Sequence, residues 1–409
     1  MKYCLIGEKL GHSFSAEIHK SNGLDYRLVE VEKDKLADFF RGKYGDFAGF
    51  NVTIPYKKAV MPFLDFIDEG AKQAGAVNTV LKRDGKFYGY NTDIAGLTYC
   101  FNRTGASIKG KTVMIFGSGG ASLAARVFCA AGGAKEIVTV SRTGAVNYFN
   151  CYDISDASVL INATPVGMYP DIYGMPFDIA RFKNAETVVD LVYNPLRTGL
   201  ILSAKERGIK CTGGLPMLVW QAFCAEKIWG YDVSREQAEK TEREILLCKT
   251  NVVLYGMPSS GKSTVGKILA EKLGKKFIDT DEEIAKVSGK TPAEIIRERG
   301  ESAFRDIETE VIKKVAAETQ AVIATGGGAV LRRENVNALK MNGFAVLIDR
   351  DISYLTAGGR PISREKGIER LYRERKELYA AAADITVKND GDIKDCVDET
   401  ERKFKEGVR

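Results

Sequence analysis

Short apolar runs alternate with charged, amphipathic stretches along the chain. Near its start, residues 3–6, 26–31 and 49–54 are apolar runs, and residues 33–40 form an amphipathic stretch between two of them. This alternation predicts strands separated by helices, which is the pattern of an α/β fold. Further strands are predicted where the pattern recurs, at residues 112–116, 136–140, 159–162, 188–193, 251–255, 276–279 and 322–324.

The strand predicted at 251–255 leads into a glycine loop that divides the chain. Gly256, Gly261, Lys262 and Ser263 form the pattern Gly-x-x-x-x-Gly-Lys-Ser, and a helix is predicted after them. Such a loop binds phosphates through backbone N–H groups at a helix N-terminus, where the dipole adds roughly half a positive charge. A strand of this type normally opens a domain, yet about 250 residues precede it. The loop therefore marks the boundary between two proteins that are joined in one chain.

The same loop predicts a nucleotide site with a metal ion. Lys262 can reach the outer phosphates of ATP, and Ser263 can ligate Mg²⁺. The alternative is a glycine-rich turn without a nucleotide, and the strand before the loop and the Lys-Ser-Thr after it disfavour that interpretation. The nucleotide is expected to contact Gly256, Ser259, Ser260, Gly261, Lys262, Ser263 and Thr264.

Composition and charge narrow the class of protein. A chain of 409 residues predicts two to three domains, and a hydrophobic content of 44% is that of an ordinary globular protein. The net charge of +6 is too small to argue for nucleic acid and suits anionic small molecules equally well. The eight Cys residues lack metal-binding spacing, and there is no signal peptide and no apolar span of about 18 residues. We therefore expect a soluble, cytoplasmic protein with small-molecule substrates, without nucleic acid, membrane or an obligatory protein partner.

Polar clusters interrupt the apolar pattern of the first hundred residues. Ser13 and Ser15 begin a helix, where they act either as caps or as ligands of a carboxylate. Residues 51–57 read Asn-Val-Thr-Ile-Pro-Tyr-Lys, residues 75–79 read Gly-Ala-Val-Asn-Thr, and residues 91–93 read Asn-Thr-Asp. In this order the clusters resemble shikimate dehydrogenase, and the resemblance extends to about residue 248.

The resemblance implies roles for individual residues. It makes Lys57 and Asp93 the catalytic pair, which suits the chemistry because reducing a ring ketone creates an alkoxide that needs a proton. His12 and His19 are interpreted as structural. The substrate is expected to contact Ser13 and Ser15 through its carboxylate, Thr53, Asn78 and Gln221 through its ring hydroxyls, and Tyr193 on the nicotinamide side.

A second glycine loop predicts a dinucleotide site. The buried strand predicted at 112–116 turns through glycines into a helix of small residues, the arrangement that holds a pyrophosphate. The turn is Gly-x-Gly-Gly-Ala, as in the family, rather than Gly-x-Gly-x-x-Gly. The cofactor is expected to contact Gly117, Gly119, Gly120 and Ala121 and, by the resemblance, Thr164 and Met217.

The strand at 136–140 ends in residues that bear on cofactor choice. Ser141, Arg142 and Thr143 stand where an NAD enzyme would offer an acidic residue to the ribose. An arginine and two hydroxyls favour the 2′-phosphate of NADP(H), and an exposed arginine without a ligand is the alternative. Thr143 and Leu160 lie only 17 positions apart, so the helix between these strands is expected to be reduced.

The residues after the phosphate loop carry a further set of motifs. Asp279 and Asp281 lie at a strand end, residues 300–308 include Arg305, and residues 326–328 are three glycines. A phosphate loop alone does not name the acceptor of the phosphoryl group. The whole set resembles shikimate kinase from residue 250 to the end of the chain.

This second resemblance also implies roles. Ser263 and Asp279 would hold the magnesium, and Asp281 would take the proton of the acceptor hydroxyl. Arg305 and Arg375 would clamp the shikimate carboxylate, since planar guanidinium groups bind carboxylates through paired hydrogen bonds. The ring would be closed in by Gly326, Gly327 and Gly328, and the transferring phosphate met by Arg360 from a lid. The lid is short, and Glu377 stands where a proline is usual, so these departures concern nucleotide binding more than the chemistry.

The expected architecture is α/β throughout. A shikimate-dehydrogenase-type substrate domain is expected at 1–100 with a return at 218–248, a Rossmann NADP-binding domain at 101–217, and a P-loop kinase domain at 249–409. The expected function is bifunctional: reduction of 3-dehydroshikimate to shikimate with NADPH, and phosphorylation of shikimate to shikimate 3-phosphate with ATP. The alternatives are a preference of the amino half for quinate, and a non-catalytic, nucleotide-binding regulatory protein.

Overall fold

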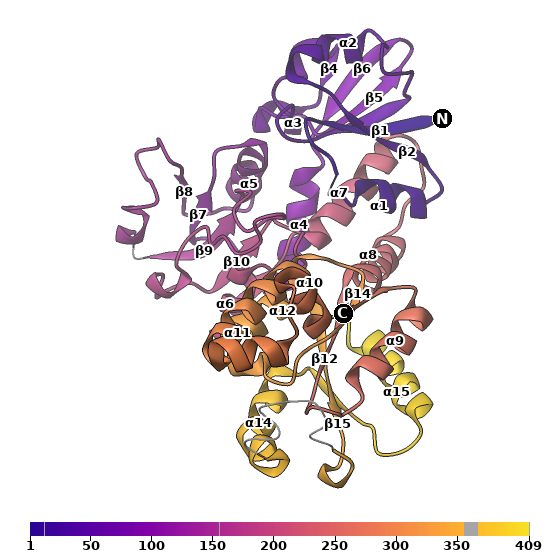
Figure 1. Ribbon diagram of the computed structural model, residues 1–409. Helices are drawn as coiled ribbons and strands as arrows, with labels where there is room; N and C mark the ends of the chain where they lie inside the picture. Colours follow the sequence, from indigo (N-terminus) through magenta and orange to yellow (C-terminus); the bar gives the residue numbers. More distant parts are fainter. Residues whose placement is uncertain (12, 155, 356–366, 409) are drawn as a thin grey trace. The chain divides into compact units, whose positions relative to one another are not determined.

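The chain folds into two compact units, Met1–Ile245 and Leu246–Arg409, in a computed structural model (Figure 1). The structure describes residues 1–11, 13–154, 156–355 and 367–408. Three separate sheets organise these residues, two in the first unit and one in the second. None of the described helices is both long and apolar enough to cross a membrane. All eight cysteines are free thiols.

The first sheet has six strands and mixed directions. Its strand order is β2-β1-β3-β5-β6-β4, in which β1 pairs with β2 and β3 in parallel and β5 pairs with β3 and β6 antiparallel. The strands are β1 (Lys2–Gly7), β2 (Asp25–Glu30), β3 (Gly49–Val52), β4 (Phe66–Ile67), β5 (Thr79–Arg83) and β6 (Lys86–Tyr90). The helices around them are α1 (Ser15–Ser21), α2 (Leu36–Phe40) and α3 (Glu69–Ala74). Side chains of β1 alternate between two cores: Cys4 and Ile6 pack with Phe50, while Tyr3 and Leu5 pack with Trp229.

The second sheet is a parallel five-stranded sheet with the order β11-β10-β9-β7-β8. Its strands are β7 (Thr112–Phe116), β8 (Glu136–Val140), β9 (Ala157–Asn162), β10 (Thr187–Asp190) and β11 (Lys210–Thr212), with helices α5 (Gly120–Ala131) and α6 (Gly199–Glu206). Between β8 and β9 the described residues contain only the short 3-10 helix η3 (Cys151–Asp153). The expected reduction of this crossover helix is therefore confirmed.

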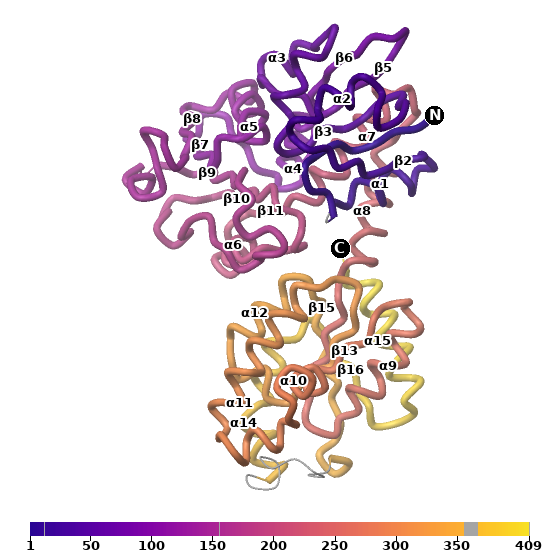
Figure 2. Tube along the Cα trace, turned by 45° about the horizontal axis from the view of Figure 1, so that its top comes forward, coloured from indigo at the N-terminus to yellow at the C-terminus, as the bar shows by residue number. Residues whose placement is uncertain are grey.

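Two long helices join the sheets of the first unit. Helix α4 (Asp93–Thr104) and helix α7 (Leu215–Ile228) lie side by side between the sheets, as Figures 1 and 2 both show. Leu97 of α4 and Met217 at the start of α7 pack into the core of the second sheet. Ala225 near the end of α7 packs against the first sheet instead, so α7 carries the chain back to it. Helix α8 (Arg235–Lys249) follows.

The second unit is a parallel sheet with helices on both faces. Its order is β13-β14-β12-β15-β16, so the first strand in sequence lies at the centre. The strands are β12 (Asn251–Tyr255), β13 (Lys276–Asp279), β14 (Ala321–Ala324), β15 (Gly343–Asp349) and β16 (Ile385–Lys388). The helices are α9 (Lys262–Leu273), α10 (Thr280–Ser288), α11 (Pro292–Ala317), α12 (Arg333–Asn342), α14 (Ile368–Ala382) and α15 (Ile393–Gly407).

Alternation along β12 explains the two helical layers. Val253 and Tyr255 point into the core that contains α11, α12 and α14, while Val252 and Leu254 point into the core of α9 and α15. A strand buried on both faces must be apolar throughout, which is why residues 252–255 form an unbroken hydrophobic run. Helix α11 is interrupted at Gly300, whose φ of 83° is not helical.

Candidate active sites

Lys57 and Asp93 meet in the first unit. Lys57 lies beyond the end of β3, and Asp93 is the first residue of α4. The distance between Lys57 Nζ and Asp93 Oδ2 is 2.6 Å, and the two side chains are 16% and 6% exposed. The pair therefore holds a charged ammonium group at a largely shielded position, where it can act as a proton donor.

The polar side chains of Asn78, Thr92 and Gln221 surround this pair. Asn78 Nδ2 donates to Asp93 Oδ1 at 2.9 Å and to Gln221 Oε1, on α7, at 3.3 Å. Thr92 Oγ1 accepts from Asn78 Nδ2 at 2.9 Å and lies 3.3 Å from Gln221 Oε1. The structure thus brings Asn78 and Gln221 to the Lys57–Asp93 pair. The sequence reasoning assigned no role to Thr92, although it directly precedes Asp93 in the Asn-Thr-Asp motif.

Ser13, Ser15 and Tyr193 form a neighbouring group. Ser13 Oγ lies 3.1 Å from Ser15 Oγ and accepts from the Ser15 N–H. Neither serine is the N-cap of α1, which is Phe14, although Ser13 accepts from the first helical N–H, that of Ser15. The Phe14 ring packs against Tyr193, with centroids 5.2 Å apart. Burial raises the pKa of Tyr193, and a hydrogen bond with Ser13 acts in the opposite direction. Thr53 is held by its backbone, whose N–H donates to the Ile6 carbonyl.

The loop after β7 has the geometry of a pyrophosphate site. Gly117 has a φ of 115°, and a Cβ at that position would lie 2.9 Å from the Ala163 carbonyl oxygen, so a glycine is required. Helix α5 begins at Gly120 with no side-chain cap, and a Cβ at Gly119 would meet open space. The uncapped N–H groups and the open approach fit an anionic dinucleotide. A Cβ at Gly120 would lie 3.0 Å from Lys57 Cδ, so this loop adjoins the catalytic pair.

The remaining cofactor residues lie at strand ends or in the core. Thr164 follows β9, and its N–H and hydroxyl both donate to Asn162 Oδ1. Met217 is buried against α4, where a Cβ at Gly96 would lie 2.8 Å from Met217 Cγ. Ser141, Arg142 and Thr143 follow β8, and Arg142 and Thr143 are exposed.

The loop after β12 forms a phosphate cradle in the second unit. Gly256, Ser259 and Gly261 all have positive φ values, of 149°, 67° and 93°. Such backbone turns N–H groups inward, and α9 begins directly after the loop without a side-chain cap. Lys262 Nζ donates to the carbonyls of Gly256 and Met257 at 2.9 Å each, which holds the ammonium group inside the loop. These features fit a nucleotide polyphosphate.

Ser263 and Asp279 meet beside this loop, with Ser263 Oγ donating to Asp279 Oδ2 at 2.6 Å. A hydroxyl and one carboxylate fit a magnesium ion that takes its other ligands from phosphates and water. No cluster of three or more His, Cys, Asp or Glu side chains suited to a metal occurs among the described residues. The hydroxyl of Ser263 and the carboxylate of Asp279 suit Mg²⁺ carried by a nucleotide.

Buried charges surround the triple glycine after β14. Arg305 Nη1 donates to Glu308 Oε2 at 2.7 Å, and Arg375 Nη1 donates to the Gly327 carbonyl at 2.9 Å. A Cβ at Gly326 would lie 2.7 Å from Asp281 Oδ1 and 3.0 Å from Glu308 Oε1, so both carboxylates face this glycine. A Cβ at Gly328 would overlap the Arg305 guanidinium. The structure thus brings Asp281, both arginines and the glycines together.

This cluster has unsatisfied donors. Arg305 and Arg375 are 7% and 3% exposed, and the buried Nε atom of each has no hydrogen-bond partner among the described residues. Leaving a buried donor unpaired costs about 1–3 kcal/mol, so such atoms indicate a site for an anionic ligand. Glu308 is a residue that the sequence reasoning missed. Burial raises its pKa, while Arg305 acts in the opposite direction. Its spacing of three residues from Arg305 on a helix was the available signal.

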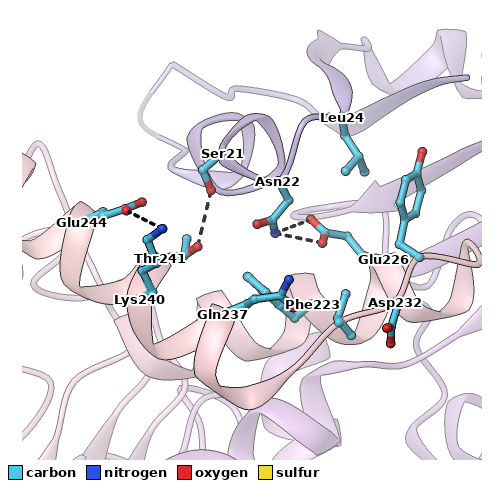
Figure 3. A pocket seen from close by; sticks show the side chains of 12 residues that line it. Ser21, Asn22, Leu24, Phe223, Glu226, Asp232, Gln237, Lys240, Thr241 and Glu244 are labelled. Atoms are coloured by element: carbon cyan, nitrogen blue, oxygen red, sulfur yellow. Dashed lines mark hydrogen bonds and ion pairs between the residues drawn. The ribbon is translucent and has the colours of Figure 1, made fainter.

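Of three further residues considered from the sequence, Arg360, His12 and His19, the structure describes only His19. Arg360 and His12 lie outside the described residues. His19 is fully buried, and its Nδ1 lies 2.7 Å from Glu226 Oε1, in agreement with a structural role. Glu226 also lines a pocket of about 290 Å³ where α1, α7 and α8 meet, and there it accepts from Asn22 Nδ2 (Figure 3). None of the predicted site residues lines this pocket.

Known proteins resemble both halves of the chain. A model of the shikimate dehydrogenase substrate binding domain matches residues 5–80, and a model of shikimate kinase matches residues 258–405. A shikimate dehydrogenase (NADP(+)) of Clostridium perfringens is 40% identical over 262 residues, covering 59% of this chain and 97% of the relative.

Solved structures agree with these matches. Shikimate dehydrogenase 1 from Peptoclostridium difficile is 35% identical with a TM-score of 0.57, covering 60% of this chain and 98% of that one. The shikimate 5-dehydrogenase of Thermus thermophilus, solved in complex with NADP(H) and shikimate, is 30% identical with a TM-score of 0.54, covering 60% and 99%. The chain therefore belongs to the shikimate dehydrogenase family and carries, over residues 258–405, a shikimate kinase domain.

Proposed function

We propose that the chain is a bifunctional enzyme that makes shikimate and then phosphorylates it. The first unit reduces 3-dehydroshikimate with NADPH, and the second transfers a phosphoryl group from ATP to the 3-hydroxyl of shikimate. The observation that carries the first activity is the Lys57–Asp93 pair beside the glycine loop at Gly120. The second rests on the phosphate loop together with the buried, incompletely bonded Arg305 and Arg375. The eight free cysteines support a reducing, cytoplasmic location.

In the reductase, Lys57 is the proton donor. NADPH supplies the hydride when it is bound at the glycine loop after β7. As the ketone oxygen gains charge, the Lys57 ammonium donates a proton to it, and Asp93 keeps the ammonium in place through the 2.6 Å contact. We assign Ser13 and Ser15 to the substrate carboxylate, Tyr193 to the nicotinamide side, and Thr53, Asn78 and Gln221 to the ring hydroxyls. Ser13 and Ser15 lie 3.1 Å apart, close enough to bind one carboxylate together.

In the kinase, Asp281 is the group that removes a proton. ATP, held by the loop at residues 256–261 with Mg²⁺ at Ser263 and Asp279, supplies the phosphoryl group. Asp281 accepts the proton of the attacking hydroxyl, and the adjacent Gly326 leaves room beside its carboxylate. Arg305 and Arg375 bind the substrate carboxylate, and Glu308 orients Arg305 through the 2.7 Å contact. We assign Arg360 to the transferring phosphate.

The test uses one purified chain and two assays. With shikimate and NADP⁺, reduced nicotinamide should accumulate in the direction opposite to synthesis. With shikimate and MgATP, ADP should form in a shikimate-dependent manner. Replacing shikimate with quinate in the first assay tests which of the two compounds is the preferred substrate. Faster reduction of NADP⁺ with quinate would overturn the assigned substrate, and absence of both activities from a folded chain would overturn the whole proposal.

Replacing Arg142 with alanine should weaken the binding of NADP⁺ much more than that of NAD⁺. Only NADP⁺ carries a 2′-phosphate, and a charged hydrogen bond to it contributes about 1.5–3 kcal/mol, which corresponds to about 10- to 100-fold in Kd. Fluorescence titration of both cofactors measures the two dissociation constants. Arg126→Ala, which removes an arginine of helix α5, is the matched control. Equal losses for both cofactors would mean that Arg142 faces away from the phosphate.

A further inference from the structure

A chain of buried hydrogen bonds leads away from the catalytic pair into the first sheet. It begins at Tyr26 on β2, whose hydroxyl donates to Asn51 Oδ1 at 2.8 Å. Asn51 Nδ2 donates to Thr79 Oγ1 at 3.1 Å, and Thr79 Oγ1 lies 3.2 Å from Asn78 Oδ1. Tyr26 and Thr79 are fully buried, and Asn51 is 4% exposed. These groups are therefore shielded from water and depend on one another for hydrogen bonds.

The order of donors and acceptors along this chain is fixed. The Asn78 backbone carbonyl can only accept and lies 3.3 Å from Asn51 Nδ2, so the NH₂ group of Asn51 faces Thr79 and its Oδ1 accepts from Tyr26. The Thr79 hydroxyl accepts there, so its own hydrogen points on to Asn78 Oδ1 or to Thr92 Oγ1, each 3.2 Å away. Asn78 Oδ1 also accepts from the Thr92 backbone N–H at 2.7 Å. The carbonyl end of the Asn78 amide is thereby held toward the sheet.

That orientation bears directly on catalysis. With its oxygen turned to Thr79 and Thr92, Asn78 presents its NH₂ group to Asp93 Oδ1 at 2.9 Å, while the other carboxylate oxygen of Asp93 contacts Lys57 at 2.6 Å. A flipped Asn78 amide would place an oxygen against the carboxylate, and the resulting repulsion would displace Asp93. The position of the proton donor thus depends on groups that do not touch it.

We propose that Asn51 and Thr79 are positioning residues of the reductase, which fix the amide of Asn78 and through it the Lys57–Asp93 pair. This inference rests on the proposed reduction of a ketone by the first unit. Their place in the sheet agrees with the role: Asn51 of β3 stands opposite Thr79 of β5 in the antiparallel register, so backbone pairing sets the distance between the two side chains.

The direct test is Thr79→Val, which removes the hydroxyl and keeps the shape. We expect kcat for shikimate oxidation to fall by about 10- to 100-fold, because the catalytic pair is misplaced, while the Kd of NADP⁺ changes by less than about twofold. Thr79→Ser, which keeps the hydroxyl, should restore most of the rate. The kinase activity of the same chain reports its concentration, and the unchanged Kd of NADP⁺ reports that the first unit is folded.

Thr112→Val is the matched control, since Thr112 is also a buried strand residue, bonds to the Asp156 side chain at 2.9 Å, and lies outside the chain of hydrogen bonds. We expect it to leave kcat unchanged. A Thr79→Val rate equal to that of Thr112→Val would overturn the proposal. Failure of Thr79→Ser to recover the rate would also overturn it, because the loss would then reflect packing. Absence of reductase activity in the wild-type chain would instead refute the proposed function.

Tyr26→Phe provides a second route if Thr79→Val unfolds the first unit. It removes the hydrogen bond to Asn51 Oδ1 while Asn51 Nδ2 stays bonded to the Asn78 backbone carbonyl at 3.3 Å, so we expect a smaller loss of kcat, of about three- to tenfold. In a double variant with Thr79→Ser, which keeps the connection, the Tyr26→Phe loss should persist. If Thr79→Val does not fold, an unchanged kcat in Tyr26→Phe alone would overturn the proposal; if it folds, combining the two variants should add nothing further, because the connection is already broken. Independent, multiplying losses in that last variant would contradict a role through Thr79.

Discussion

Replacing Lys57 with alanine is expected to lower the rate of ketone reduction by about 10²- to 10⁴-fold, the usual effect of losing a general acid. The ammonium lies 2.6 Å from Asp93 Oδ2, and no other lysine is placed in this contact among the described residues. Phosphorylation of shikimate should continue at the wild-type rate, because the two sets of site residues lie in separate compact units. Reduction of 3-dehydroshikimate and formation of ADP are measured on the same preparation.

The adjacent lysine offers the control for this experiment. Lys58 is exposed and one residue away, so Lys58→Ala tests whether any loss of positive charge near the site is enough to slow the reaction. We expect the Lys58 variant to reduce the ketone at close to the wild-type rate. An undiminished reductase rate in the Lys57 variant would exclude Lys57 as the proton donor.

The second large effect is expected from Asp281→Asn in the kinase unit. An amide has the shape of the carboxylate but cannot take the proton of the attacking hydroxyl, so phosphoryl transfer to shikimate should fall by about 10²- to 10⁴-fold. The amide remains compatible with the neighbouring Gly326, where a Cβ would lie 2.7 Å from Asp281 Oδ1. Single-turnover measurement of shikimate 3-phosphate separates this step from the binding of ATP.

Two further variants test whether the effect of Asp281→Asn comes from the loss of the proton acceptor. Glu282→Gln changes the next carboxylate along the chain and should leave transfer unchanged. Asp279→Asn alters the partner of Ser263 and should weaken the binding of MgATP. If Asp281→Asn lowers the affinity for MgATP and spares the transfer step, Asp281 belongs to the metal site and the assigned role is wrong. Reductase activity of the same chain serves as the measure of intact protein.

Local sequence was sufficient for the parts of this protein that depend on neighbours along the chain. Spacing alone predicted the phosphate loop, since a strand, Gly256, Gly261 and Lys262 must follow each other closely to form it. Counting residues between Thr143 and Leu160 predicted the reduced crossover, because a strand connection that short leaves little chain for a helix. The resemblance to known families supplied the catalytic pair, since a lone lysine and a lone aspartate 36 residues apart carry no local signal of contact.

Tertiary structure decided everything that depends on which distant residues become neighbours. Ser13 and Ser15 follow the pattern of a helix cap, yet the N-cap of α1 is Phe14, and the two serine Oγ atoms lie 3.1 Å apart. Arg305 is buried against the glycines after β14, and Glu308 is the carboxylate that pairs with its charge there. The need for this partner comes from the burial, which the local sequence does not show.

The contact of Asn51 with Thr79 shows most clearly why the sequence alone does not determine which strands pair and in which register. The two residues lie 28 positions apart, and a register shift of one residue between β3 and β5 would turn one of them to the opposite face of the sheet. Register is set by the summed packing of the whole sheet and its helices. A short stretch of sequence therefore indicates which helices and strands form. It does not indicate which strands pair, because pairing depends on packing over the whole sheet.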